Sequence, residues 1–372
     1  MYTHLPKSLV REDYEKMAAR AAQVLGVAEG VKAVYLLGDI WQPGISDMDL
    51  LVVFKDGSQP GLVSPWSMGE LAEYIFTHRF LSMNEMTARK FFYLFPFETT
   101  DVRLISGRKI DFENPHEVMN VEEYRDLIAC VFFDILITKL LPLAGIMMTE
   151  KNINIRSRIG AVYSLRYSEI LLKILCQYEM SDHLRRRIVS LRNKWFDRTQ
   201  KENLSLLEEV SQESILLIAD MTQEFAKYTR ARYPITSSHI FNNQRYTLTF
   251  SDNWTLEEFE RKYYRGHIHL SLLGRKFEHD VLLLPRELSV YLAWYASGEG
   301  VLSRRMRKIY KESARQQSMP VGVRMHIEAL NTAFKGYSTS MGVHKIPYTL
   351  GFRAIQSYWR DMVGWGILHL LR

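Results

Sequence analysis

The chain has 372 residues, of which 47% are hydrophobic and 24% are charged, and its formal net charge is +6. This composition is that of a soluble globular protein, and the length allows two or three domains. We expect no signal peptide, because the first residues lead into charged positions rather than into an apolar core. The two cysteines, Cys130 and Cys176, lie too far apart in sequence to form a metal or redox motif, which favours a reducing cytoplasm.

The first 115 residues alternate between helical and extended patterns. Apolar periodicity predicts helices over 11–25, 68–80 and 88–93, and buried strands over 31–37 and 49–54. Glycine, serine and proline mark a loop over 57–65. From Thr100 to Phe112 the sequence favours two extended arms about a turn at Ser106-Gly107, and Asn114-Pro115 closes the unit.

The middle of the chain is predicted to be helical. From 121 to about 232, apolar residues recur at helical spacing with few glycines, which is typical of a helical bundle. Residues 127–148 approach the length of a membrane span, but Asp134, Lys139 and Pro142 interrupt them. We therefore expect a buried helix here and no membrane partner.

The C-terminal part follows a polar break over 234–244 and mixes an extended candidate at 267–273 with helices such as 286–296 and 302–316. The expected domains are 1–118, 119–233 and 234–372. Residues 1–115 carry a net charge of −3 and residues 233–372 one of +8. Four basic residues share one helix face, namely Arg304, Lys308, Lys311 and Arg315. This face predicts either RNA binding through the basic segment or an ordinary solvated surface.

Two carboxylates stand one residue apart at the head of the strand predicted over 49–54. Because side chains on a strand alternate between its faces, we expect Asp47 and Asp49 to point the same way and Met48 to point into the protein. Two like charges this close need a cation. Carboxylate oxygens suit Mg²⁺, which fills its remaining positions with waters and substrate phosphates. The motif therefore indicates phosphoryl-group chemistry.

The residues around this motif resemble the signature of the nucleotidyltransferase superfamily that includes DNA polymerase β. In that family a strand ends in Gly-Gly or Gly-Ser, a short loop or helix follows, and two acids one residue apart open the next strand. Here Gly38-Asp39 ends the first strand, and Ser46-Asp47-Met48-Asp49 follows the loop. The resemblance covers about the first 115 residues. For these residues it implies a mixed sheet with flanking helices. Together with the helical bundle and a basic C-terminal segment that is either α/β or mostly helical, the expected fold class is α+β.

The family also takes a third carboxylate from a later strand. Asp101 fits best, because Arg103 follows it by two residues, as in protein-modifying members such as the glutamine synthetase adenylyltransferase; Asp111 is the weaker candidate. The resemblance implies catalytic and metal-binding roles for Asp47, Asp49 and Asp101, with Mg²⁺ or Mn²⁺ as the metal. It implies that the nucleotide is bound by Gly38, Asp39, Ser46 and Arg103.

The expected reaction is transfer of a nucleoside monophosphate from an NTP, with ATP as the first candidate, to a hydroxyl on a protein, a small molecule or RNA. One residue departs from the family pattern. Asp39 stands where Ser or Gly usually donates a hydrogen bond to a phosphate, and a carboxylate only accepts. Either a metal intervenes or Asp39 turns away to cap the following turn. The alternative function is a catalytically degenerate module that binds a nucleotide or a partner.

Overall fold

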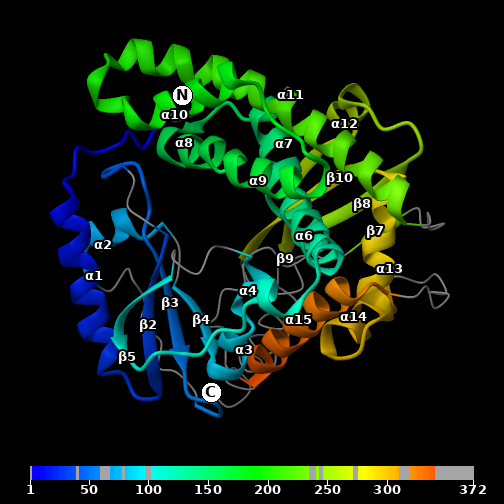
Figure 1. Ribbon diagram of the computed structural model, residues 1–372. Helices are drawn as coiled ribbons and strands as arrows, with labels where there is room; N and C mark the ends of the chain where they lie inside the picture. The colour runs from blue at the N-terminus through cyan, green and yellow to red at the C-terminus, as the bar shows by residue number, and fades with distance from the viewer. Residues whose placement is uncertain are drawn as a thin grey trace.

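The structure is a computed structural model, which describes residues 2–38, 42–58, 68–77, 80–96, 102–233, 240–242, 246–270, 275–309 and 319–339. Its class is mixed α+β, as predicted: a four-stranded sheet, a set of longer helices, and a second four-stranded sheet with further helices (Figure 1). One hydrophobic cluster includes residues from all three parts, such as Leu51, Phe132 and Leu283. The three expected domains therefore share a core.

The first sheet contains β2 (Val31–Leu37), β3 (Asp49–Phe54), β4 (Leu81–Asn84) and β5 (Val102–Gly107), in the order β4-β3-β2-β5. β3 is parallel to β4, and the other two pairs are antiparallel. Its outer face, with Leu36, packs on α1 (Arg11–Gly26) and α2 (Glu70–Ile75). Its inner face, with Tyr35, joins the shared core beside α3 (Glu85–Arg89) and α4 (Phe91–Leu94).

Two elements of this part differ from the prediction. Among the described residues, the helix expected over 68–80 is limited to α2, and strand β4, which was not predicted, follows it. In the part of the chain that the structure describes, no second strand follows the turn at Ser106-Gly107. The chain leaves the sheet after Gly107 and crosses the inner face. There the Ile110 N–H donates to the Tyr35 hydroxyl at 2.6 Å, and Phe112 packs edge-on against the Tyr35 ring. The Ile110 N–H is thus bound by the Tyr35 side chain, where the prediction expected strand pairing.

The middle part is helical, as predicted. Its helices are α5 (Pro115–Val118), α6 (Val121–Ile135), α7 (Leu141–Thr149), α8 (Ile155–Tyr163), α9 (Leu165–Cys176), α10 (Asp182–Asn193) and α11 (Gln200–Arg232), with a π-helical turn over Leu136–Leu140 and a 3₁₀ turn over Trp195–Asp197. Asn120, Ser181 and Thr199 cap the N-termini of α6, α10 and α11. β1 (Tyr2–Thr3) pairs with β6 (Ile153–Asn154) and ties the start of the chain to the bundle.

α6, the π-helical turn and α7 form one apolar helix over Val121–Thr149. Its length and composition would allow it to cross a membrane, and 89% of its most apolar 18-residue stretch is buried inside the structure. This agrees with the prediction of a buried helix. Pro142 stands in the first turn of α7, after the π-helical turn, where Pro is tolerated because its missing N–H is not needed.

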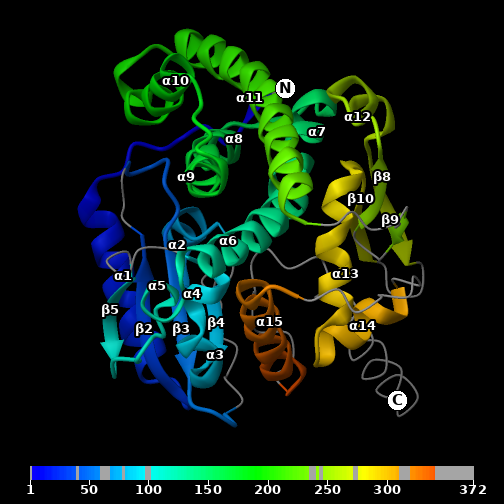
Figure 2. The same ribbon diagram turned by 45° about the vertical axis from the view of Figure 1, so that its right-hand side comes forward.

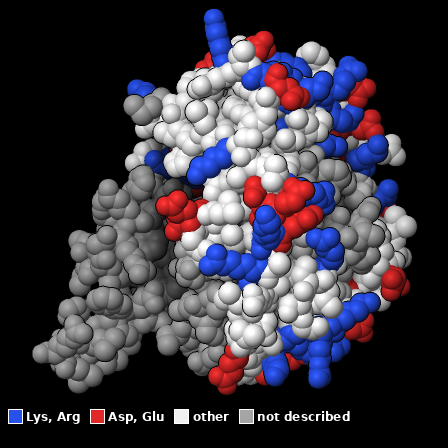
Figure 3. All heavy atoms as spheres, turned by 90° about the vertical axis from the view of Figure 1, so that its left-hand side faces the viewer, with Lys and Arg blue, Asp and Glu red and all other residues white. Residues whose placement is uncertain are grey.

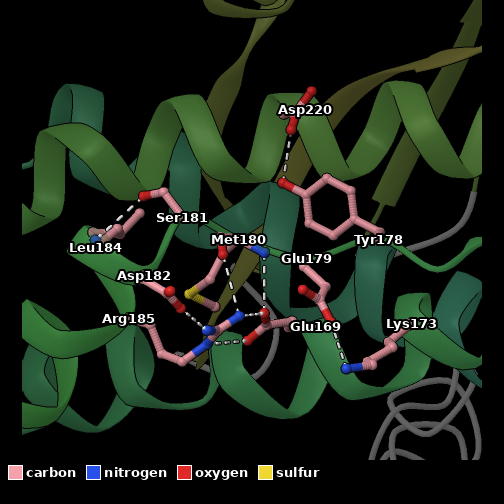
Figure 4. A network of polar contacts seen from close by, with 10 residues as sticks. All are labelled: Glu169, Lys173, Tyr178, Glu179, Met180, Ser181, Asp182, Leu184, Arg185 and Asp220. Carbon is pink, nitrogen blue, oxygen red and sulfur yellow. Dashed lines mark hydrogen bonds and ion pairs between the residues drawn. The ribbon is translucent and has the colours of Figure 1, made fainter.

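The connection between α9 and α10 is held by charged side chains (Figure 4). Arg185 donates to Glu169 at 2.5 Å and to the Met180 carbonyl at 3.1 Å, and the Met180 N–H donates back to Glu169 at 3.0 Å. Tyr178 donates to Asp220 on α11 at 2.7 Å. These contacts fix the course of the chain between the two helices, so the charge of Arg185 is used within the bundle.

The C-terminal part contains more strands than the sequence indicates. β7 (Ile240–Asn242), β8 (Tyr246–Ser251), β9 (Tyr264–Leu270) and β10 (Arg275–Pro285) form a sheet in the order β7-β8-β10-β9. The helical elements are α12 (Leu256–Lys262), a 3₁₀ turn (Arg286–Leu288), α13 (Ser289–Ser297), α14 (Val301–Ile309) and α15 (Val321–Thr339). Of the two predicted alternatives, the segment is thus the mixed one rather than the mostly helical one, because pairing stabilises strands whose own periodicity is weak.

α15 returns to the first sheet and lies between that sheet and α13 and α14, against α6 and α4 (Figure 2). His326 on α15 contacts the Tyr93 carbonyl through Nδ1 at 2.7 Å and Asp134 Oδ2 through Nε2 at 3.2 Å. The Tyr295 hydroxyl donates to the same Asp134 oxygen at 2.8 Å. We call Asp134, Tyr295 and His326 the Asp134 cluster. It is buried and joins all three parts of the chain.

Asp134→Asn is expected to change how stability depends on pH. Burial raises the pKa of the Asp134 carboxyl, and the hydrogen bonds from His326 and Tyr295 offset only part of that effect. The folded state then binds the proton more tightly than the unfolded chain, whose Asp has a pKa of about 4. The free energy of unfolding of the wild-type protein, measured in urea relative to Asp134→Asn, should therefore fall as the pH rises above about 4, by at most about 1.4 kcal/mol per pH unit. A rise over this range would contradict the raised pKa.

The face of the molecule that carries α1 shows charged side chains of both signs, interspersed with one another (Figure 3). Within α1 itself, the Arg11 guanidinium lies 3.3 Å from the Glu15 carboxylate. Mixed charge of this kind does not generate the single-sign field that steers a polyanion to a surface. This face therefore gives no electrostatic reason to place an anionic ligand on it.

Candidate active site

The predicted site lies at one end of the first sheet. Leu37, the last residue of β2, pairs with Asp49 at the start of β3 on one side and with Val102 at the start of β5 on the other. Gly38 follows with a φ of +68°, a left-handed conformation that glycine adopts without steric cost, and turns the chain into the loop before β3. The Gly38 turn, the acidic motif and the first residue of β5 therefore meet at one sheet edge.

The acidic motif spans the start of β3: Asp47 and Met48 precede the strand, and Asp49 opens it. Met48 is 3% exposed and packs on the outer face, whereas Asp47 is exposed and Asp49 is half-buried. Asp49 shares the inner face of the sheet with Leu51, which is two residues further along β3. Asp47 Oδ2 accepts a hydrogen bond from the Thr77 hydroxyl at 2.8 Å. The acidic pair is thus open to solvent at Asp47 and partly enclosed at Asp49.

Of the two candidates for the third carboxylate, Asp101 lies outside the described residues, as does Asp39. Asp111 is described and exposed. In the described part of the chain, no three His, Cys, Asp or Glu side chains gather where they could hold a metal ion. Asp111 therefore does not complete a site with Asp47 and Asp49.

The loop before β3 is held by tyrosines from α1 and α2. The Tyr14 hydroxyl accepts from the Gly44 N–H at 3.0 Å and donates to the Ser46 carbonyl at 2.6 Å. The Tyr74 hydroxyl donates to the Gly44 carbonyl and accepts from the Lys7 N–H at 2.8 Å. Gly44 has a φ of +81°, and a Cβ atom there would lie 1.9 Å from the Lys7 carbonyl oxygen, so a larger residue does not fit. Burial raises the pKa of Tyr14, which keeps its hydroxyl protonated.

Two arginines of the helical part reach the same loop. Arg156 on α8 donates through Nε to the Ile45 carbonyl at 3.1 Å, through Nη2 to the Ser46 carbonyl at 2.8 Å, and through Nη1 to the Tyr74 carbonyl. Arg192 on α10 donates to the Ser46 hydroxyl at 2.5 Å. Both arginines are 8% exposed. Burial lowers the pKa of Arg192, although Asp47 is among the groups that favour its charged form.

Nucleotide binding by Ser46 and Arg103 stays a prediction, and the structure describes the contacts of Ser46 and the register of Arg103. Ser46 is 5% exposed, and its hydroxyl accepts from Arg192 and from the Gln42 N–H at 3.1 Å. Its contacts support the loop. Arg103 pairs with Leu36, whereas Asp49 pairs with Leu37, so the side chains of Arg103 and Asp49 start from opposite faces of the sheet.

At least one residue of the basic helix predicted near the C-terminus makes hydrogen bonds within the fold. Arg307 on α14 donates to the carbonyls of Ala296 and Gly298, both at 2.8 Å, and so fastens α14 to the end of α13. Arg304 is exposed, while Lys311 and Arg315 lie outside the described residues. RNA binding through this segment stays a prediction.

The sequence analysis missed Thr77, Arg156 and Arg192. Arg156 lies 110 positions from Ser46 in the chain, and Arg192 lies 146 positions from it. Local periodicity places both arginines on helices but says nothing about which loop they reach. A basic residue on an otherwise apolar helix face is the one signal that points to such a contact.

Comparison of the chain with protein-family models, with curated proteins and with solved structures found no match in any of the three.

Proposed function

We propose that the chain is a metal-dependent nucleotidyltransferase, which transfers a nucleoside monophosphate from an NTP to a hydroxyl acceptor. The observation that carries this proposal is the register of the first sheet, in which the Gly38 turn, Asp49 and the start of β5 lie at one edge. Asp101, the proposed third carboxylate, directly precedes Val102, the residue of β5 opposite Leu37. ATP is the first NTP to test, and a reducing cytoplasm is the proposed compartment for a chain whose Cys130 and Cys176 are both free thiols.

The donor set at this edge suits Mg²⁺ or Mn²⁺. Asp47 and Asp49 offer hard carboxylate oxygens one residue apart at the start of β3, and the exposure of Asp47 leaves room for water and phosphate oxygens. Thr77 donates to one Asp47 oxygen at 2.8 Å and so orients the carboxylate. When bound, the metal neutralises phosphate charge as the reaction proceeds.

In the proposed reaction, the oxygen of the acceptor hydroxyl forms a bond to the α-phosphorus of the NTP. The bond from that phosphorus to the bridging oxygen of the β-phosphate breaks, and pyrophosphate leaves. Asp101 is the proposed acceptor of the hydroxyl proton. Because phosphoryl transfer depends on positioning and charge neutralisation, the proposal requires no further reactive group from the protein.

The test is a labelling experiment. We would incubate the purified protein with each α-³²P-labelled NTP and Mg²⁺ or Mn²⁺, alone and with cell extract, beside a double variant, Asp47→Ala/Asp49→Ala. We expect label on a protein, RNA or small molecule only when both aspartates are present. Calorimetry would measure metal-dependent NTP binding in the same two proteins.

Absence of label together with absence of metal-dependent NTP binding would overturn the proposal. The chain would then be a module that keeps the sheet and the acidic motif without catalysis. Label that persists in the double variant would place the transfer chemistry at other residues and would equally reject the assignment. A variant matched in charge change, Glu257→Ala/Glu260→Ala at exposed positions of α12 in the C-terminal part, controls for the loss of two negative charges.

A further inference from the structure

Side chains of the helical part bind Ser46, the residue immediately before Asp47. The helices that carry these side chains, α8 and α10, lie above the first sheet in Figure 1. Arg156 comes from α8 and Arg192 from α10, and both bind Ser46, the residue that precedes Asp47. We infer that these two arginines are positioning residues, through which the helical part sets the place of the acidic motif. The inference rests on the function proposed above and assigns to the helical part a role in that same site.

The main chain is fixed on both sides of Asp47. Before it, the Ser46 carbonyl accepts from Arg156 at 2.8 Å and from the Tyr14 hydroxyl at 2.6 Å. After it, the Met48 N–H donates to the Ile75 carbonyl at 3.2 Å. The Asp47 carboxylate itself stays exposed. The contacts therefore restrain the backbone and leave the acidic oxygens accessible, which is what holding a ligand in place requires.

Packing alone does not account for arginine at these two positions. Both side chains are 8% exposed, and their hydrogen-bond partners among the described residues are neutral carbonyl and hydroxyl groups. A buried charge carries a desolvation penalty, and apolar residues of similar volume often replace one without loss of stability. A guanidinium group adds a rigid fork of donors in fixed directions. Arg156 uses all three of its side-chain nitrogens on three different carbonyls.

Aromatic rings fix the orientation of both guanidinium groups. Arg156 lies over the Tyr74 ring at 4.0 Å from its centroid, and Arg192 lies over the Tyr163 ring at 3.9 Å. Tyr74 also binds the Gly44 carbonyl in the same loop. Arg156 and Tyr74 therefore hold the loop from two directions while they restrain each other. Lysine keeps the charge of arginine but reproduces neither the fork nor the stacking.

The chain offers a matched control in Arg158. It lies two residues from Arg156 on α8, its side chain is 6% exposed, and it donates to Glu150 at 3.4 Å, outside the loop before β3. We would compare the wild-type protein with Arg156→Lys, Arg192→Lys and Arg158→Lys. The measurements are hydrogen exchange of the backbone amides of 43–48, the affinity for Mn²⁺ by calorimetry, and the rate of nucleotidyl transfer at saturating ATP. Circular dichroism would establish that each variant is folded.

We expect the amides of 43–48 to exchange about tenfold faster or more in Arg156→Lys, because each lost bond from a charged donor favours local opening of the loop. The transfer rate should fall about 10- to 100-fold with little change in KM for ATP, since displacing a reactive group by about 1 Å has an effect of that size. Arg192→Lys should show a smaller change in the same direction. Arg158→Lys should match the wild-type protein in exchange over 43–48 and in rate.

The outcomes separate this inference from the proposed function. If the wild-type protein transfers label but Arg156→Lys keeps both its rate and its amide protection, the arginines are structural and the inference is wrong, while the function stands. If the wild-type protein neither transfers label nor binds Mn²⁺, the proposed function is wrong and the inference falls with it. If Arg158→Lys loses rate and protection as Arg156→Lys does, the effect belongs to α8 as a whole, which also overturns the inference.

Discussion

Asp49→Asn is expected to lower the rate of Mg²⁺-dependent nucleotidyl transfer by about 1000-fold or more. The amide keeps the shape of the side chain but removes the negative charge, and losing several kcal/mol of transition-state stabilisation corresponds to such a factor. Asp49 is half-buried and opens β3 next to Leu37, so the substitution should leave the strand and its pairing unchanged. The measurement is the initial rate of label transfer from α-³²P-ATP at saturating Mg²⁺.

Thr77→Val provides a graded comparison at the same site. Thr77 donates to Asp47 Oδ2 at 2.8 Å and acts only through that carboxylate. Loss of a group that orients a metal ligand typically costs about 10- to 100-fold, so Thr77→Val should fall between the wild-type protein and Asp49→Asn. Higher Mg²⁺ should restore part of the rate of Thr77→Val and none of that of Asp49→Asn. A rate for Asp49→Asn close to that of the wild-type protein would remove this residue from the chemistry.

Strong local patterns predicted the core of the first sheet. The strand over 31–37 and the strand over 49–54 appear at those bounds, and the helix expected over 11–25 ends one residue later, at Gly26. These segments combine apolar periodicity with clear end signals, so each is specified by its own residues. β4, with the sequence Leu-Ser-Met-Asn, has only 4 residues and lacks β-branched residues. It exists because Leu81 to Asn84 pair with β3 in parallel, which no local pattern reveals.

The candidate site, like the sheet, was predictable where a local pattern was enough and not where a tertiary contact decided. The alternation expected for the acidic motif placed Met48 inside and Asp47 outside, although β3 itself begins only at Asp49. The position of Arg103 was not predictable, because it depends on which residue of β5 pairs with Leu36, and a shift of one residue reverses the faces. Arg156 could not be assigned to the loop either, since helical periodicity fixes a face of α8 but not its neighbour in the fold. Tertiary contacts between distant segments decided these cases.

The Asp134 cluster links α6, α13 and α15 through buried polar groups, and this is the second place where a single substitution should have a large effect. Nε2 of His326 lies 3.2 Å from both Asp134 Oδ2 and the Tyr295 hydroxyl, and Nδ1 lies 2.7 Å from the Tyr93 carbonyl. The other Asp134 oxygen, Oδ1, is buried and has no hydrogen-bond partner among the described residues. Loss of the imidazole would therefore leave the Asp134 carboxyl with one hydrogen bond from those residues, donated by Tyr295.

His326→Ala is expected to lower the free energy of unfolding by about 1 to 3 kcal/mol, the range found when a buried polar group loses its hydrogen-bond partner. The Asp134 carboxylate would keep only the hydrogen bond from Tyr295, and the Tyr93 carbonyl would lose its contact with His326. Urea unfolding followed by circular dichroism measures the change. His183→Ala on the exposed surface of α10 is the control and should stay within about 0.5 kcal/mol of the wild-type protein.

Because His326 also connects α15 to α4, its loss should act locally before it acts globally. In native-state hydrogen exchange, the backbone amides of α15, which carries His326, should lose protection at lower urea concentrations than the amides of α11. A smaller change, below about 1 kcal/mol, would mean that water or a rearranged Tyr295 replaces the imidazole. A double-mutant cycle with Tyr295→Phe separates these two cases, because the effect of Tyr295→Phe should be larger in the His326→Ala background than in the wild-type protein only if Tyr295 has taken over the contact.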